Sequence, residues 1–166
     1  VLFKMGVCFL YDQIKFLPPH YVGTHMNINL VTDQNARSVE NHENLLITEV
    51  DKLPDSLCKS VTLNNTLNYL TDEQFRQLLN KVRHGGIVSV SAPDVMEIST
   101  ALCWGQIDVP TFSSLTTNRV SQYSLLQIKN VFEQSGYIIE SASIHNLSFY
   151  IKARRPWMKN QNKKNK

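Results

Sequence analysis

Residues 83–94, Arg-His-Gly-Gly-Ile-Val-Ser-Val-Ser-Ala-Pro-Asp, constrain the fold of this chain more than any other stretch. A β-branched apolar run follows a glycine pair and ends at a proline, which is typical of a buried strand. The preceding residues carry an apolar stripe at helical spacing. The sequence therefore predicts a helix over 72–84 that stops on Gly85, followed by a strand over 86–92. This helix–turn–strand step presents a ligand crevice at the carboxyl edge of a parallel sheet.

The rest of the chain continues the same alternation. Apolar and polar residues predict strands at 27–31, 45–50 and 60–63. A second helix opens at Ser124 and closes on Gly136. Two strands follow, at 137–142 and 147–153, and the link between them is too short for a crossover helix, so this pair is antiparallel. Residues 95–122 form a long irregular stretch, and its length suggests a functional loop.

Length and charge indicate one domain without a nucleic-acid-binding surface. The chain has 166 residues and a formal net charge of +3, but four lysines lie in the last ten residues, so the remainder is nearly neutral. We expect an α/β domain over 26–156 and a disordered Lys/Asn-rich tail over 157–166. Residues 1–25 form an N-terminal extension of uncertain status, because Met26 could be the natural start.

The cysteines and histidines predict neither a disulfide framework nor a metal site. Cys8, Cys58 and Cys103 are three in number and widely spaced, and the five histidines show no ligand spacing. This usage favours a reducing cytoplasm. No apolar run is long enough to cross a membrane, and no signal peptide is clear.

Several short motifs in this order resemble a class I S-adenosylmethionine-dependent methyltransferase of the small phage and bacterial type. They are Glu49 before Leu53-Pro54, the Asn-Thr-Leu-Asn-Tyr-Leu stretch at 65–70, the Gly-Gly pair at 85–86 with Pro93, and Ser-Gly-Tyr at 135–137 before the final hairpin. The resemblance spans residues 26–155. It implies a Rossmann-like methyltransferase fold: a mostly parallel sheet with helices on both faces and an antiparallel C-terminal hairpin.

One feature of that family is missing from the sequence. The first strand of such enzymes runs into a glycine-rich turn, in which the absent Cβ lets the backbone approach the cofactor. Here Val31 is followed by Thr-Asp-Gln-Asn-Ala-Arg, and no glycine occurs between Gly23 and Gly85. The segment from Met26 to Glu49 is also short, so we expect a truncated N-terminal βα unit and a degenerate cofactor motif.

The resemblance implies a set of cofactor-binding and acceptor-binding residues. The cofactor, S-adenosylmethionine, is expected beside Asp33, Glu49, Val50, Asn64 and Asn65. Residues on the acceptor side are expected to be Asp94, Trp104 and Tyr123, which border the long loop. Each has a simpler structural explanation: a solvated strand-end acid for Glu49, turn chemistry for the two asparagines, and a lid packed on the core for Trp104.

Two functions remain open from the sequence. The first is a methyltransferase acting on an unknown acceptor, either a sugar or another small molecule. Methyl transfer depends mainly on positioning, so no catalytic residue is assigned. The second is a non-catalytic binding or assembly module that has lost its cofactor. A shortened sheet could also expose an edge and pair with a second copy as a homodimer.

Overall fold

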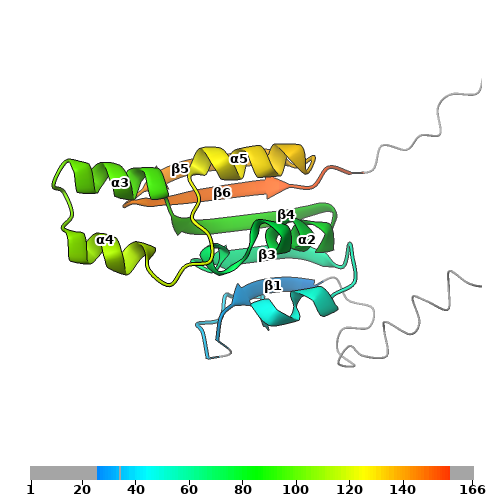
Figure 1. The fold of residues 1–166 in the computed structure, drawn as a ribbon. Helices are drawn as coiled ribbons and strands as arrows, with labels where there is room; N and C mark the ends of the chain where they lie inside the picture. Colours follow the sequence, from blue (N-terminus) through cyan, green and yellow to red (C-terminus); the bar gives the residue numbers. More distant parts are fainter. Residues whose placement is uncertain (1–25, 34, 158–166) are drawn as a thin grey trace, which may run out of the picture.

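The computed structural model describes residues 26–33 and 35–157, which form a six-stranded sheet with helices packed against it. The strands are β1 (Met26–Val31), β2 (Glu43–Leu46), β3 (Cys58–Asn64), β4 (Val82–Pro93), β5 (Ile138–His145) and β6 (Ser148–Arg154). The helices are η2 (Ile47–Lys52), η3 (Leu67–Tyr69), α2 (Asp72–Lys81), α3 (Val95–Cys103), α4 (Val109–Thr116) and α5 (Leu125–Gln134) (Figure 1).

The strand order is β2-β1-β3-β4-β6-β5. Strands β1 to β4 are parallel, and β6 runs antiparallel to both β4 and β5. The predicted mostly parallel sheet with an antiparallel C-terminal hairpin is therefore confirmed. Among the described strands, β2 and β5 are the edge strands. The N-terminal extension and the last nine residues of the tail lie outside the described residues, so the predicted domain limits stay a prediction.

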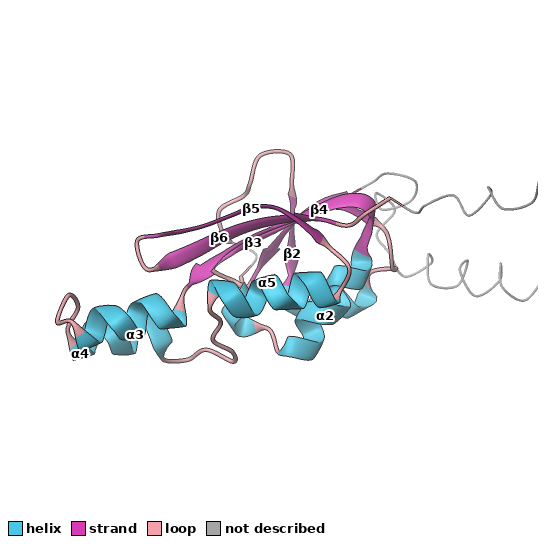
Figure 2. Ribbon diagram, turned by 90° about the horizontal axis from the view of Figure 1, so that it is seen from above, coloured by secondary structure: helices cyan, strands magenta, loops and turns pink. Residues whose placement is uncertain are grey.

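The main helices cover one face of the sheet (Figure 2). Alternate residues of the strands point to this face and join the core, among them Leu30, Leu63, Val90 and Ile151. The residues between them point to the opposite face, and many of these side chains are polar, among them Asn29, Thr62, Ser89 and Lys152. Helices were expected on both faces, but residues 32–42, which join β1 to β2, contain no helix in their described part. The shortened βα unit expected from the sequence accounts for this open face.

The predicted end of the first long helix is wrong. Helix α2 ends at Lys81, and residues 82–85 already belong to β4. Gly85 has a φ of +76° within the strand, where the β4 register shifts between the partners of Cys58 and Ser60. The backbone of this bulge pairs with the C-terminal segment: Gly85 N donates to Arg155 O at 2.8 Å, and Arg155 N donates to Gly86 O at 2.9 Å. A partner about seventy residues away therefore overrides the local helix-stop signal.

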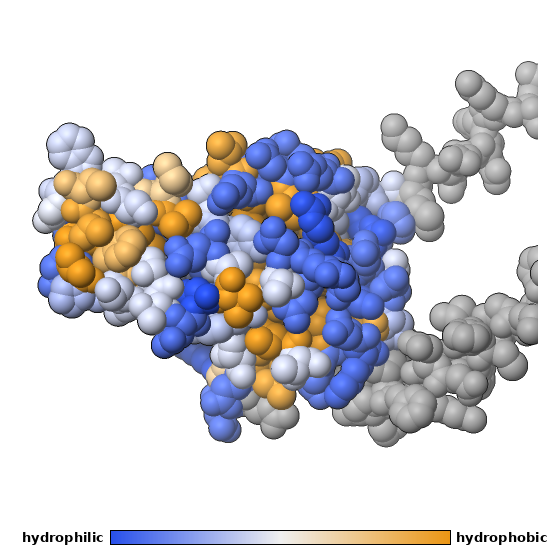
Figure 3. Space-filling model, in the orientation of Figure 1, coloured by the Kyte–Doolittle hydropathy of each residue, from blue (hydrophilic) through white to orange (hydrophobic). Residues whose placement is uncertain are grey.

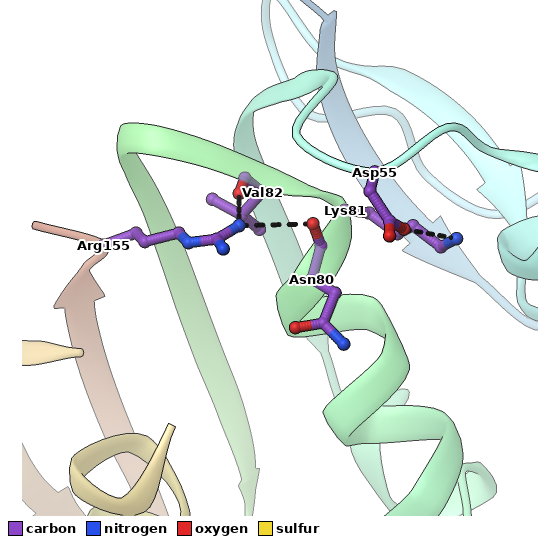
Figure 4. A network of polar contacts seen from close by, with 5 residues as sticks. All are labelled: Asp55, Asn80, Lys81, Val82 and Arg155. Carbon is purple, nitrogen blue, oxygen red and sulfur yellow. Dashed lines mark hydrogen bonds and ion pairs between the residues drawn. The ribbon is translucent and has the colours of Figure 1, made fainter. Parts of the chain in front are cut away.

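Side chains add to the contact between this bulge and the C-terminal segment (Figure 4). The guanidinium of Arg155 donates to the carbonyls of Asn80 and Val82, which lie at the end of α2. Beside them Lys81 pairs with Asp55 at 2.9 Å. The two bonds of Arg155 satisfy backbone carbonyls that a helix leaves without an intrahelical partner at its C-terminus.

Two other sequence expectations need correction. The strand predicted over 45–50 is β2 only as far as Leu46, and η2 follows it, because Val50 turns back into the core. Residues 95–122 are not irregular: they contain α3 and α4. Asp94 and Asp108 cap these two helices, with Asp108 Oδ1 accepting from Thr111 N at 2.9 Å. The N-caps were present in the sequence, but the short helices have weak apolar periodicity.

Candidate functional site

The carboxyl ends of β1 and β3 mark the point where the chain reverses its direction across the sheet. From β1 the chain passes to β2 on one side, and from there it returns to β3 on the other side of β1. In open α/β sheets, ligands bind outside the carboxyl ends of the strands at such a switch point. The topology alone therefore directs attention to this edge.

A hollow of about 620 Å³ lies at this switch point, within the size range of small-molecule sites. We call it the switch-point hollow. One wall is the connection that follows β1, and the other is the segment that follows β3 together with Arg119. Its lining consists of Asn29, Leu30, Val31, Thr32, Ala36, Arg37, Ser38, Val39, Asn64, Asn65, Thr66, Tyr69 and Arg119.

Three buried polar atoms of this lining have no hydrogen-bond partner among the described residues. They are Asn29 Oδ1, Thr66 Oγ1 and Arg119 Nε. Asn29 and Thr66 are only 2% and 6% exposed. A buried polar group without a partner costs free energy, so native proteins satisfy such groups with protein, water or ligand. These three atoms therefore lie around one hollow, where water or a polar ligand can satisfy them.

Asn64 is the last residue of β3, Asn65 follows it, and both line the switch-point hollow. Asn65 has a φ of +57°, a left-handed conformation that asparagine tolerates better than most residues. Its backbone N–H donates to Ser91 O at 2.8 Å, which fixes the turn against β4. Both side chains are exposed and border the hollow. Turn chemistry and a binding role are therefore compatible at this pair.

A pair of asparagines holds the opposite wall in place. Asn29 Nδ2 donates to Asn44 Oδ1 at 2.8 Å and to Arg37 O at 3.3 Å. Asn44 Nδ2 in turn donates to Ala36 O at 2.9 Å. These bonds join the connection after β1 to β1 and β2. Although this connection lacks glycine, its described residues Thr32 and 36–39 line the hollow.

Arg119 is held at the mouth of the hollow by neighbours on η3. Its guanidinium carbon lies 4.7 Å from the centroid of the Tyr69 ring, within the range of a cation–π contact. The next two backbone N–H groups, of Val120 and Ser121, both donate to Asn68 O. Ser121 Oγ donates to Leu70 O at 2.8 Å. The position of Arg119 is therefore fixed by the segment that follows it.

A second, shallower hollow of about 230 Å³ lies on the open face of the sheet. Asn64 lines both hollows. The second one is bordered by hydroxyl and amine groups in two cross-strand rows, Ser89–Lys152–Ser141 and Ser91–Tyr150–Ser143. The two hollows thus meet at the end of β3.

The sequence-predicted cofactor residues divide into two groups. Asn64 and Asn65 line the switch-point hollow, and Asp33 lies in the connection that borders it, where its Oδ1 accepts from Asn35 N at 2.9 Å. Glu49 and Val50 lie in η2 and are not part of the lining: Glu49 pairs with Lys52 at 3.6 Å, and Val50 is buried in the core. A role for these two in cofactor binding stays a prediction.

Of the three predicted acceptor-side residues, Asp94 and Tyr123 are brought together as partners in an isolated parallel β-bridge, whereas Trp104 lies at the opposite end of α3 from Asp94. Asp94 is 1% exposed, and its carboxylate caps α3 through Met96 N and Glu97 N. Trp104 is 77% exposed at the end of α3. Helices α3 and α4 form an arm beside the sheet, with apolar side chains at its surface (Figure 3). None of the three predicted residues lines either hollow.

Tyr123 forms a structural contact. It is mostly buried, and its hydroxyl donates to the carboxylate of Asp72 at the start of α2. Burial and this hydrogen bond raise the pKa of the Tyr123 hydroxyl to about 12. The phenol therefore stays protonated at neutral pH.

Sequence reasoning predicted only Asn64 and Asn65 of the lining, and the residues that it missed include Asn29, Thr66, Tyr69 and Arg119. Asn29 is a polar residue within the strand predicted over 27–31. The alternation of this strand did not show that the side chain of Asn29 is buried beside a hollow rather than exposed to solvent. Arg119 was hidden in the stretch expected to be irregular. Within the described residues no group of three His, Cys, Asp or Glu side chains could hold a metal ion. Among these residues no helix has both the length and the apolar character to span a membrane.

Solved structures with a similar fold include S-adenosylmethionine-dependent methyltransferases. The enzyme from Mesorhizobium loti is 15% identical over 87% of this chain and 96% of its own, with a TM-score of 0.56. The enzyme from Archaeoglobus fulgidus is 10% identical over 92% and 94%, with a TM-score of 0.53. An O-methyltransferase family protein from Burkholderia thailandensis is 12% identical over 90% and 56%, with a TM-score of 0.55.

These identities establish the fold alone: the chain has the Rossmann-like methyltransferase fold. No protein-family model and no curated protein sequence matches the chain.

Proposed function

We propose that this protein binds S-adenosylmethionine in the switch-point hollow and transfers its methyl group to an acceptor. The observation that carries the proposal is the hollow itself, which has unpartnered buried polar atoms and lies at the switch point of a methyltransferase fold. Its volume and its mixture of donors and acceptors fit a polar cofactor. A cytoplasmic location and a small-molecule or sugar acceptor belong to the same proposal.

The residues of the hollow would bind and orient the two reactants. When bound, S-adenosylmethionine would supply a methyl group on a cationic sulfur for transfer to the acceptor. The amides of Asn64 and Asn65 offer donors and acceptors at the strand end, and Asn29 Oδ1 and Thr66 Oγ1 offer buried ones. Such positioning is the main requirement of methyl transfer.

Calorimetric titration with S-adenosylmethionine and S-adenosylhomocysteine tests the proposal. We expect a Kd below about 100 μM for at least one of them, which corresponds to roughly −5.5 kcal/mol. Asn65→Gly keeps the left-handed backbone accessible and removes only the amide, so it should weaken binding about tenfold. Glu73→Gln changes an exposed residue on α2, outside the hollow, and should leave the Kd within twofold, whereas Glu49→Gln tests the separate prediction that Glu49 lies beside the cofactor.

Two other outcomes would point elsewhere. Loss of binding in Glu49→Gln with full binding in Asn65→Gly would place the cofactor beside η2 rather than in the hollow. No heat with either ligand would refute cofactor binding and favour the non-catalytic module, which the missing glycine turn also favours. A homodimer formed across the β2 or β5 edge stays a prediction that sedimentation of the full chain can test.

A further inference from the structure

The charges around the switch-point hollow are unbalanced. Its lining includes two guanidinium groups, Arg37 and Arg119, and no carboxylate. Within the described residues no ion pair involves either arginine. Asp33 lies in the connection beside the hollow but is not part of the lining. Among residues 26–33 and 35–157, the hollow therefore presents positive charge without a paired carboxylate.

Arg119 is the better placed of the two cations. Arg37 is exposed on the connection after β1, whereas Arg119 is partly buried and rests on the Tyr69 ring. The buried Nε of Arg119 has no partner among the described residues. Thr66 Oγ1, a second unpartnered group of the same lining, can also donate. A planar guanidinium with free donors matches the two oxygens of a carboxylate or a phosphate.

The charge of the proposed cofactor strengthens this argument. The methyl donor carries a cationic sulfur, so its binding would add positive charge beside two arginines. Like charges in a partly buried site oppose each other, and an anion between them relieves that opposition. We propose, on the basis of the proposed function above, that the methyl acceptor carries a carboxylate or phosphate group and that Arg119 binds it.

Anion binding is measured on the full chain with inorganic phosphate and with acetate, followed by the backbone amide NMR signals of Asn65 and Thr66, which line the hollow and are present in every Arg119 variant. We expect these signals to shift with a Kd on the order of 1 mM. Arg119→Gln should weaken anion binding at least tenfold. Arg119→Lys keeps the charge but not the planar guanidinium, so its anion affinity should lie between those of the native chain and Arg119→Gln. Arg76→Gln removes an equal charge on α2, outside the hollow, and should change the Kd less than twofold.

A second measurement links the anion to the cofactor. Phosphate or acetate should tighten the binding of S-adenosylmethionine several-fold, because the anion offsets the sulfur charge, and the effect should vanish in Arg119→Gln. The uncharged thioether of S-adenosylhomocysteine should show a smaller effect. The stronger of the two anions identifies the acceptor group as a phosphate or a carboxylate.

Two results would overturn the inference. Equal anion binding by the native chain and by Arg119→Gln is the first, provided that circular dichroism shows both to be folded. In the second, Arg119→Gln weakens the binding of S-adenosylhomocysteine about tenfold but leaves the binding of 5′-methylthioadenosine, which lacks the carboxylate, unchanged. This result would show that Arg119 binds the carboxylate of the cofactor and not the acceptor. If neither cofactor form binds, the proposed function fails, while the anion titration still decides the role of Arg119.

Discussion

Asp94 and Leu125 join the start of α3 to the start of α5: Asp94 Oδ2 accepts a hydrogen bond from Leu125 N at 2.7 Å. The other carboxylate oxygen accepts from Met96 N and Glu97 N at 2.9 and 3.2 Å. One buried carboxylate therefore satisfies free N–H groups at two helix N-termini, where negative charge is also favoured. Its contacts give Asp94 a structural role at the starts of α3 and α5, while a role on the acceptor side stays a prediction.

Replacement of Asp94 should therefore reduce stability strongly. We expect Asp94→Ala to lower the free energy of unfolding by about 3 kcal/mol, because three bonds to a charged, buried acceptor are lost. Urea denaturation followed by circular dichroism measures this change. Asp108→Ala removes the exposed cap of α4 and should cost clearly less. Equal losses in the two variants would contradict the structural role given to Asp94.

The bulge at Gly86 provides a second prediction. A Cβ at this position would lie 2.8 Å from Arg83 O and 3.0 Å from Lys59 O, both backbone atoms that cannot move independently of the sheet. Gly86→Ala should therefore destabilise the fold by about 2 kcal/mol.

Gly136→Ala is the matched control for this substitution. Gly136 has a φ of +76°, but a Cβ there would meet nothing within 4 Å, so only the backbone cost of about 1 kcal/mol is expected. Thermal unfolding of both variants compares the two costs. A cost at Gly86 no larger than at Gly136 would show that the bulge relaxes freely.

The fold could be predicted further from the sequence than the site could. Strand alternation and helix caps are local signals, and the helix start at Ser124 and the stop at Gly136 appear in the structure as expected. Gly85 gave an equally strong local signal, but pairing with Arg155 placed it inside a strand. The walls of the hollow depend on such contacts between residues far apart in the sequence. The backbone N–H groups of Val120 and Ser121 donate to Asn68 O, and these two bonds hold the neighbouring Arg119 beside the hollow.

Alkaline pH should destabilise the fold through Cys58. Burial raises the pKa of the Cys58 thiol to about 12, although Lys81 opposes the rise. The unfolded thiol releases its proton near pH 9, so between about pH 9 and pH 12 the folded state holds more protons than the unfolded state. The free energy of unfolding must then fall as pH rises. Tyr123 and Tyr137, whose pKa values are also raised, add to the same trend.

Urea titrations at several pH values compare the native chain with Cys58→Ala, whose stability should decline less steeply above pH 9. The comparison uses the slope of stability against pH, because the smaller side chain also changes the absolute stability.

In the folded Cys8→Ser chain, iodoacetamide should react with the exposed Cys103 and spare Cys58 until urea unfolds the protein. Rapid labelling of Cys58 in the folded state would contradict its burial.

The last prediction links the wall of the hollow to ligand binding. Asn44→Ala removes the bonds that Asn44 makes to Asn29 and to Ala36, so residues 36–39 should lose their attachment to β1 and β2. We expect a stability loss of about 1 kcal/mol, faster hydrogen exchange at residues 36–39, and S-adenosylhomocysteine binding that weakens several-fold. Asn27→Ala is the control, because Asn27 binds Asn41 O at the far end of the same connection and does not line the hollow. It should leave the ligand affinity unchanged. If Asn44→Ala loosens the wall but keeps full affinity, residues 36–39 do not contact the ligand, and the binding surface is limited to the segment that follows β3.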